Sequence, residues 1–430
     1  MSYLYKKYFQ LDSKFLKKIE KAEEKIQPSI NLIKEIVLDN QAKVLRAFKE
    51  NRVSEFHFAG STGYGYHDIG RQVLENIYAE AFNGEEALVR THFVSGTHTL
   101  FVCLDALLSP AETLLSAAGA PYDTLQKVIG INTLPQKGTL AAKGVSYRQV
   151  DLTPEGRLDF QELERVLKKI KSVTVVLLQR SRGYAWRPSV SLAEIEKLSN
   201  LIKKINPNII YFVDNCYGEF VNPVEPLEIG ADLIAGSLIK NPGGGLAPAG
   251  GYAVGRKDLI ELIADRLTAP GLGKEVGATL AHNRSLFQGL FLAPHAVGEA
   301  LKTAIFAAAL LEEYGFEVSP TFGEERGDIV QAVRFTQPDY LLSFCQGIQK
   351  HSPVDSYVQP QPANMAGYGD KVIMAAGTFI QGASLEMTAD APYRSPYTAY
   401  LQGGLTFEHG KIALIGAIKE VLETINRNKE

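Results

Sequence analysis

Two side chains that could take part in chemistry, an acid and a lysine, follow neighbouring apolar segments of the chain. Asp214 comes directly after the apolar run IIYFV at residues 209–213. An acid at the carboxyl end of a buried strand is costly unless a positive group meets it. Lys240 lies in the glycine-rich segment 236–245, just after the next expected strand. This order places a carboxylate and an amine on one predicted sheet.

A third segment, Ser95-Gly96-Thr97, leads into an apparent helix. Exposed amides at a helix start, beside small hydroxyl residues, form an anion site. A lysine, a carboxylate and a phosphate cradle on one sheet suit pyridoxal phosphate: the lysine forms a Schiff base with the aldehyde, the acid pairs with the pyridinium nitrogen, and the helix start holds the phosphate. Each feature has a plainer interpretation, as a solvated loop charge, a helix cap or a turn. Their order and spacing together favour the cofactor.

The elements that must position these residues begin at about residue 56, where short apolar strands alternate with helical segments. Continuous apolar strands separated by helices predict a mostly parallel sheet buried on both faces, with ligands at the turns that follow its strands. The expected strands are 87–89, 174–178, 209–213, 233–235 and 252–254, with helices such as 159–171 and 192–205 between them.

Two further regions flank this α/β pattern. The first fifty residues are expected to be helical, and after Pro28 their apolar positions follow one face of a 3.6-residue period. Near residues 291–294 the pattern passes into a long apolar helix and then into a smaller α+β region. We therefore expect an N-terminal helical segment at 1–55, a large α/β domain at 56–290 and a small domain at 291–430.

The composition narrows the class of protein. The chain has 430 residues, of which 45% are hydrophobic and 22% charged, as is usual for a globular protein. Its net charge of −3 argues against a large basic surface for nucleic acid or anionic membrane. The longest apolar stretch, 304–311, is far shorter than the roughly 20 residues that span a bilayer, and the N-terminus has no apolar core of signal-peptide type. The 3 cysteines and 8 histidines show no metal-like spacing. These features predict a cytoplasmic protein without a structural metal.

Five motifs give the sequence a family resemblance. They are GYGYHDIGR at 63–71, FVSGTH at 93–98, VDNCYGE at 213–219, GSLIKNPGGG at 236–245 and QGASLE at 381–386, continuing to Arg394. The chain from about residue 56 resembles the fold-type I pyridoxal phosphate enzymes of the cystathionine and methionine gamma-lyase group, most closely the methionine gamma-lyase-like or aluminium-resistance proteins. The resemblance implies a PLP-dependent transferase-like fold, with a large, mostly parallel seven-stranded sheet domain and a smaller C-terminal α+β domain. It also implies a homodimer or homotetramer with shared active sites.

The same resemblance assigns roles to individual residues. Lys240 matches the Schiff-base lysine, which also moves protons, and Asp214 matches the acid that keeps the ring nitrogen protonated. Tyr122 lies where the family places a tyrosine stacked on the ring, whose phenol is an acid for the leaving group. An ordinary turn tyrosine is the alternative for Tyr122. The expected phosphate ligands are Ser95, Gly96, Thr97 and Ser237.

One expected phosphate contact departs from the family pattern. Tyr66 is similar to the family tyrosine that reaches across a dimer interface to the partner's phosphate. Two residues later the gamma-lyases have an arginine, whereas this sequence has Asp68. Arg71 is therefore either a substitute phosphate ligand or an ordinary arginine at a helix start.

Three other arginines are candidates for contacts with substrate. The planar fork of an arginine is the natural partner of an α-carboxylate, and Arg394 in the smaller domain is our choice, against a structural ion pair. Arg180 or Arg182 contacts substrate or phosphate, or else lies on the surface. Cys216, close to Asp214, is interpreted as a small buried thiol and not as a nucleophile.

The expected activity is that of a carbon–sulfur lyase. The resemblance implies elimination of a thiol from Cβ or Cγ of a sulfur amino acid, with release of ammonia and an oxo acid. Lys240 would remove the Cα proton, and Tyr122 would assist departure of the thiolate. The alternatives are an aminotransferase, a synthase that replaces a γ-substituent, and a pyridoxal phosphate-binding regulator without turnover. The aluminium-resistance label describes a phenotype, which no residue here explains chemically.

Overall fold

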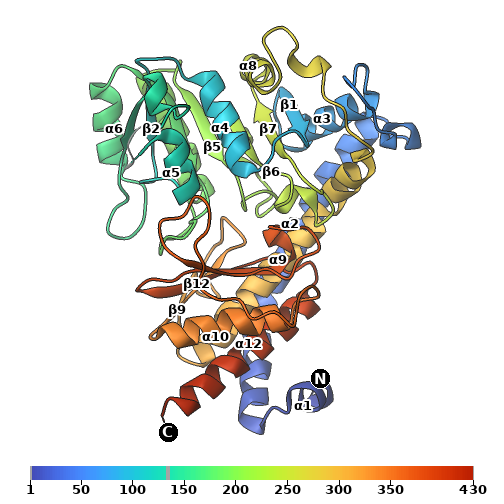
Figure 1. The fold of residues 1–430 in the computed structure, drawn as a ribbon, viewed down its shortest axis with the longest axis vertical. Helices are drawn as coiled ribbons and strands as arrows, with labels where there is room; N and C mark the ends of the chain where they lie inside the picture. Colours follow the sequence, from blue (N-terminus) through green and yellow to red (C-terminus); the bar gives the residue numbers. More distant parts are fainter. Residues whose placement is uncertain (1, 132–135, 430) are drawn as a thin grey trace. The chain divides into compact units, whose positions relative to one another are not determined.

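The computed structural model describes residues 2–131 and 136–429, which form two compact units (Figure 1). The larger unit is Leu38–Pro294, and the smaller one combines Met1–Val37 with His295–Glu430. The second boundary falls close to the expected residue 290. The separate N-terminal segment at 1–55 stays a prediction, and its long helix has residues in both units.

The larger unit is built on a seven-stranded sheet with the order β1-β7-β6-β5-β4-β2-β3. Strands β3, β2, β4, β5 and β6 pair in parallel, whereas β7 is antiparallel to both β6 and β1. The five expected strands are confirmed as β1, β4, β5, β6 and β7, and β2 and β3 are additional. The strands are β1 (Glu86–Arg90), β2 (Thr113–Ser116), β3 (Ser146–Gln149), β4 (Val173–Gln179), β5 (Ile210–Asp214), β6 (Leu233–Ser237) and β7 (Gly251–Gly255).

Helices α4 (Gly96–Leu107) and α8 (Lys257–Leu267) pack against the central strands. Apolar side chains of both helices join those of β4, β5, β6 and β7 in one buried cluster, which fixes the start of α4 against the sheet. The expected helices at 159–171 and 192–205 are confirmed as α6 and α7. The other helices of this unit are α3 (Ile69–Ala81), α5 (Asp123–Ile129), α6 (Phe160–Lys169) and α7 (Leu192–Ile205).

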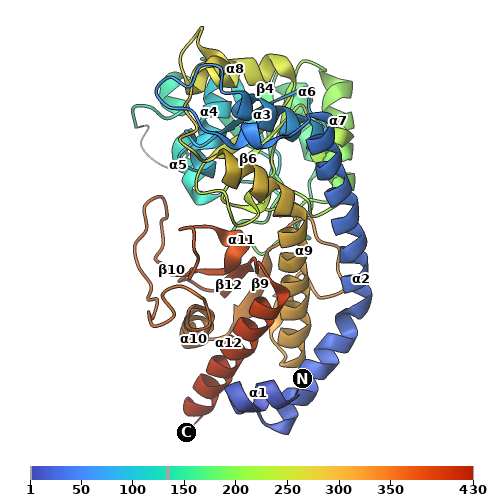
Figure 2. The same ribbon diagram turned by 90° about the vertical axis from the view of Figure 1, so that its right-hand side faces the viewer.

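The smaller unit contains a five-stranded antiparallel sheet with the order β10-β11-β12-β9-β8. Helices α10 (Pro338–Lys350) and α12 (Phe407–Arg427) pack against each other beside it (Figure 2). The expected α+β architecture of this region is thereby confirmed. Its strands are β8 (Glu317–Ser319), β9 (Gln331–Phe335), β10 (Val372–Ala375), β11 (Thr388–Pro392) and β12 (Tyr397–Gln402), and α1 (Ser2–Phe9) and α11 (Ser384–Met387) are short helices.

Two long helices run through the boundaries between the units. Helix α2 (Ser13–Glu50) continues through Pro28, and α9 (Asn283–Glu313) continues through Pro294. Within the smaller unit they approach closely at Gly298, where an added Cβ would lie 2.3 Å from Cγ2 of Val37. Among the described helices, none is both long and apolar enough to cross a membrane.

Candidate active site at the ends of strands β5 and β6

The expected acid and lysine follow adjacent parallel strands of the larger unit. Asp214 is the last residue of β5 and pairs in register with Ala235 of β6. Lys240 comes three residues after the end of β6 and precedes a single 3₁₀ turn, Asn241–Gly243. Because the two strands are parallel, their carboxyl ends lie at the same sheet edge, which is where ligands of α/β sheets bind.

The lysine amine and the Asp214 carboxyl influence each other electrostatically. Burial raises the pKa of Asp214, which is 3% exposed, and the charge of Lys240 opposes that shift. The Nζ atom of Lys240 lies 3.8 Å from the centroid of the Tyr217 ring. Burial by itself lowers the pKa of Lys240, yet this pKa is raised well above its usual range because four neighbours favour the charged form: Cys216, Tyr217, Asp214 and Tyr122. The buried carboxyl therefore depends on a nearby cation to carry its charge.

The expected phosphate cradle lies at the N-terminus of α4, against the strand that leads to Lys240. Ser95 is the N-cap of this helix, and its hydroxyl accepts a hydrogen bond from the His98 amide at 3.2 Å. A Cβ added at Gly96 would lie 3.2 Å from Cβ of Ser237, so glycine permits this close approach. The first amides of a helix point outward and favour an anion. Gly96, Thr97 and Ser237 are thus brought together.

Tyr122 lies beside this cradle and not in an isolated turn. Its phenol donates a hydrogen bond to Oγ1 of Thr97 at 3.1 Å, and its backbone amide donates to Oε1 of Gln179 at 2.9 Å. Burial raises the pKa of Tyr122, and the negative charge of Asp214 adds to the shift. The phenol therefore stays protonated at neutral pH, in the state required of an acid.

Tyr66 and Arg71 lie in the N-terminal part of the larger unit, and their surroundings differ. Tyr66 is 54% exposed, and its ring contacts that of Tyr64 at a centroid distance of 5.7 Å. Arg71 is 1% exposed and donates to the backbone carbonyls of Gly65, Gly277, Lys274 and Glu275. Because these carbonyls occupy its guanidinium, the structure favours the structural alternative for Arg71 over a phosphate ligand.

Asp68, which replaces the family arginine, has a structural role of its own. It is the N-cap of α3, and Oδ1 accepts a hydrogen bond from the Arg71 amide at 2.9 Å. Burial by itself raises the pKa of Asp68, but hydrogen bonds from Ser61, Thr279, Arg71 and Asn283 outweigh it and lower this pKa. The departure from the family pattern is therefore a charged helix cap.

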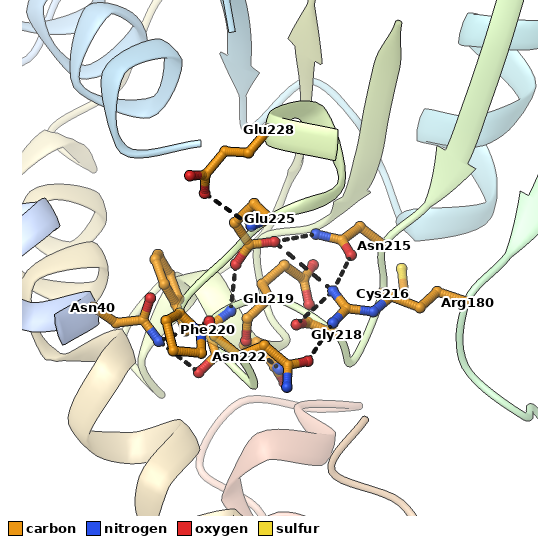
Figure 3. Close-up of polar contacts among 12 residues, drawn as sticks. Asn40, Arg180, Asn215, Cys216, Gly218, Glu219, Phe220, Asn222, Glu225 and Glu228 are labelled. Atoms are coloured by element: carbon orange, nitrogen blue, oxygen red, sulfur yellow. Dashed lines mark hydrogen bonds and ion pairs between the residues drawn. The ribbon is translucent and has the colours of Figure 1, made fainter. Parts of the chain in front are cut away.

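Arg180 is fully buried and binds the loop that follows β5 (Figure 3). Its Nη1 donates to Oδ1 of Asn215 at 2.8 Å and to the carbonyl of Gly218 at 2.9 Å, and Nη2 donates to Oδ1 of Asn222 at 2.8 Å. Glu225, also fully buried, lies 3.8 Å from Nη1. This placement corrects the expectation that Arg180 lies on the surface, and it engages both terminal nitrogens of the guanidinium in hydrogen bonds within the larger unit.

We predict that Arg180→Met destabilises the protein by about 3–5 kcal/mol, because Glu225 would keep a buried charge without its cation. Denaturant unfolding of the apoprotein measures the loss. Glu225→Gln in the same chain should restore part of the lost stability. Arg165→Met, which removes an ion pair on α6 whose arginine side chain is 60% exposed, should leave the midpoint unchanged. An Arg180→Met protein that unfolds at the wild-type midpoint would show that the network has no such role.

Two other candidate arginines differ in exposure. Arg182 is 1% exposed in the larger unit. Arg394, in the smaller unit, is exposed, and its Nη1 forms an ion pair with Oδ2 of Asp370 at 2.5 Å. Both stay predictions as substrate ligands. Cys216 is 7% exposed, and burial raises the pKa of its thiol, in agreement with a buried, unreactive cysteine.

The side chains gathered at this sheet edge fit pyridoxal phosphate. An amine is available for the aldehyde, a buried carboxyl that needs a cation is available for the ring nitrogen, and a helix N-terminus is available for the phosphate. No group of three or more metal-ligating side chains occurs in the described parts of the chain. Together with the sheet order, these features define a fold-type I enzyme of the pyridoxal phosphate class.

Comparison with known proteins places the chain more narrowly: it belongs to the methionine gamma-lyase family, whose model matches residues 15–422. A carbon-sulfur lyase involved in aluminum resistance from Clostridium novyi NT has 50% sequence identity and a TM-score of 0.93, covering 97% of this chain and 98% of that one. The uncharacterized protein YnbB of Bacillus subtilis is 48% identical over 391 residues, 91% of this chain and 92% of that protein.

A more distant structure extends the comparison of folds. The pyridoxal-5'-phosphate dependent protein YhfS of Escherichia coli has 19% identity and a TM-score of 0.61, covering 91% of this chain and 97% of that one. The predicted family and fold class are confirmed, and so is pyridoxal phosphate as the cofactor of this family.

Proposed function

We propose that this protein is a pyridoxal phosphate-dependent carbon–sulfur lyase that eliminates a thiol from a sulfur amino acid and releases ammonia and an oxo acid. The observation that supports this most strongly is the meeting of Lys240, Asp214 and the α4 N-terminus at the ends of adjacent parallel strands. The 50% identity to a carbon-sulfur lyase supports the same class of reaction.

Pyridoxal phosphate, when bound, supplies a sink for the electrons released at the substrate Cα. Lys240 holds the cofactor and accepts the Cα proton at Nζ. Asp214 retains the proton on the ring nitrogen, which the charge of its buried carboxylate favours. Gly96, Thr97 and Ser237 bind and orient the phosphate. Tyr122 donates its phenolic proton to the departing sulfur.

Elimination can be distinguished from transamination and from γ-replacement by its products. Incubation of the purified protein with methionine, homocysteine, cysteine or cystathionine in turn should continuously release ammonia, an oxo acid and a thiol, or hydrogen sulfide in the case of cysteine and homocysteine. An aminotransferase would stop after one half-turnover without an oxo-acid acceptor, and a synthase would require an added thiol acceptor. Failure of every one of these amino acids to yield ammonia would contradict the lyase assignment.

Tyr122→Phe is expected to lower turnover by roughly 10²–10⁴-fold while cofactor binding is retained. The loss should be largest for substrates whose thiol is most basic, because those leaving groups need the proton most. Steady-state kinetics across a series of thiol leaving groups measures this dependence. Tyr147→Phe on β3 is a matched control without a predicted effect. An equal loss for all leaving groups would argue against Tyr122 as the acid.

The family resemblance also suggests a ligand for the substrate carboxylate, a localisation and an oligomeric state. We propose that Arg394 or Arg182 binds the substrate carboxylate, since the fork of a guanidinium matches its two oxygens. We also propose a cytoplasmic homodimer or homotetramer, in which Tyr66 contacts the phosphate held by the neighbouring subunit. The exposure of Tyr66 in the single chain is compatible with that arrangement.

A further inference from the structure

Glu219 is a fully buried acid packed against Gly236 of β6, the strand that leads to Lys240, and neither the sequence motifs nor the proposed mechanism gives it a role. Its Oε1 accepts a hydrogen bond from the phenol of Tyr252 at 2.7 Å. Its Oε2 is buried and has no hydrogen-bond partner among the described residues. An ionised carboxylate buried in this way is far more costly than a neutral carboxyl.

The carboxyl of Glu219 is held rigidly in position by its neighbours. A Cβ added at Gly236 of β6 would lie 2.8 Å from Oε1 of Glu219, so the glycine makes room for the acid under the strand that leads to Lys240. The ring of Tyr252 stacks on Phe82, with centroids 5.6 Å apart and an angle of 15°. The side-chain amide of Asn241, next to Lys240, donates to the backbone carbonyl of Glu219 at 2.9 Å.

The charged and titratable groups around Glu219 come from several elements. Burial raises the pKa of Glu219 from its ordinary value of 4.5 to about 8, Tyr252 opposes the shift, and Glu225 adds to it. Lys240 is the neighbouring cation that favours the ionised form. The groups that face it are Tyr252 from β7, Tyr78 from α3, Cys216 and Glu225 from the loop after β5, and Lys240.

We propose that Glu219 is a positioning residue of the candidate active site: its carboxyl, buried between Tyr252 and Gly236 of the strand that leads to Lys240, adjusts through its state of protonation the pH at which the bound cofactor loses its proton. The proposal rests on the proposed function, because it requires that Lys240 holds pyridoxal phosphate. Figure 3 shows Glu219 in the loop after β5, beside the Arg180 network.

The apoprotein tests the proton on Glu219 without any cofactor. The unfolded carboxyl loses its proton near pH 4.5, whereas the folded one keeps it to about pH 8. Between these values the folded state binds more protons, so this group makes wild-type stability fall as the pH rises. Glu219→Gln should therefore gain in unfolding midpoint relative to wild type across this window, by at least about 3 °C. A difference that is constant with pH would overturn the proposal.

Two tyrosine variants keep the test decisive if Glu219→Gln does not fold. Tyr252→Phe removes the phenol that favours the ionised acid, so the fall in stability should extend to higher pH than in wild type. Tyr78→Phe is the control, because it removes an equally buried phenol of the same aromatic cluster. The Tyr78 hydroxyl donates its hydrogen bond to the Pro242 carbonyl and not to Glu219, so this variant should leave the pH dependence of stability unchanged. Identical profiles for the two variants would contradict the proposal.

The holoenzyme tests the link to Lys240. The absorption of the bound cofactor is measured as a function of pH. Glu219→Gln should lower the midpoint of the spectral transition by about one pH unit, because the variant lacks the Glu219 carboxylate that favours the protonated cofactor in alkaline solution. An unchanged midpoint would overturn the positioning role. If the protein takes up no pyridoxal phosphate, the proposed function fails, whereas the apoprotein measurements still decide whether Glu219 is protonated.

Discussion

Replacement of Lys240 by alanine is expected to lower turnover by at least about a thousandfold, because the amine both holds the cofactor and carries the Cα proton. The absorption of covalently held pyridoxal phosphate should disappear in the same variant. Lys240→Arg is the matched control: it retains a cation beside Asp214, so the fold is preserved, but it provides no amine for the cofactor. Wild-type absorption and turnover in Lys240→Ala would contradict the assignment.

Asp214→Asn is expected to weaken retention of the cofactor and to reduce turnover by at least about a hundredfold. The variant has the same size, and its side-chain oxygen can still accept the Cys216 amide hydrogen bond, which is 3.2 Å long in the wild type. It lacks the negative charge that stabilises the protonated ring nitrogen.

The rate at which dialysis removes pyridoxal phosphate, together with kcat, measures both effects of Asp214→Asn. Asp214→Glu, which keeps the charge, should recover part of the turnover. If Asp214→Asn turns over at the wild-type rate, the carboxylate does not act on the ring.

The fold class could be predicted because each buried parallel strand is a continuous run of apolar residues in the sequence. Strand β4, VTVVLLQ, is a run of this kind. Strand β2 has only four residues, and β3, SYRQ, is largely exposed and polar, so neither shows a periodic signal. Similarly, the continuation of α2 through Pro28 depends on packing along its length, which overrides the tendency of proline to break helices.

The candidate site could be predicted where its residues come at or just after the end of an apolar strand, or at the start of a helix. Asp214 and Lys240 have that property, and the structure brings them together. Arg180 also follows a strand, but its role depends on Glu225, an acid far away in the sequence. The burial of Glu219 could not be predicted from the sequence, because its environment is formed by Gly236 and Tyr252, which belong to strands β6 and β7.

The most direct test of the central claim is to add pyridoxal phosphate to the purified protein, reduce it with borohydride and map the modified peptide by mass spectrometry. Reduction converts the link between cofactor and protein into a stable bond at whichever amine holds it. Our account predicts one pyridoxyl group per chain, attached to the side chain of Lys240. A label on another lysine, or a protein that remains unmodified, would contradict it.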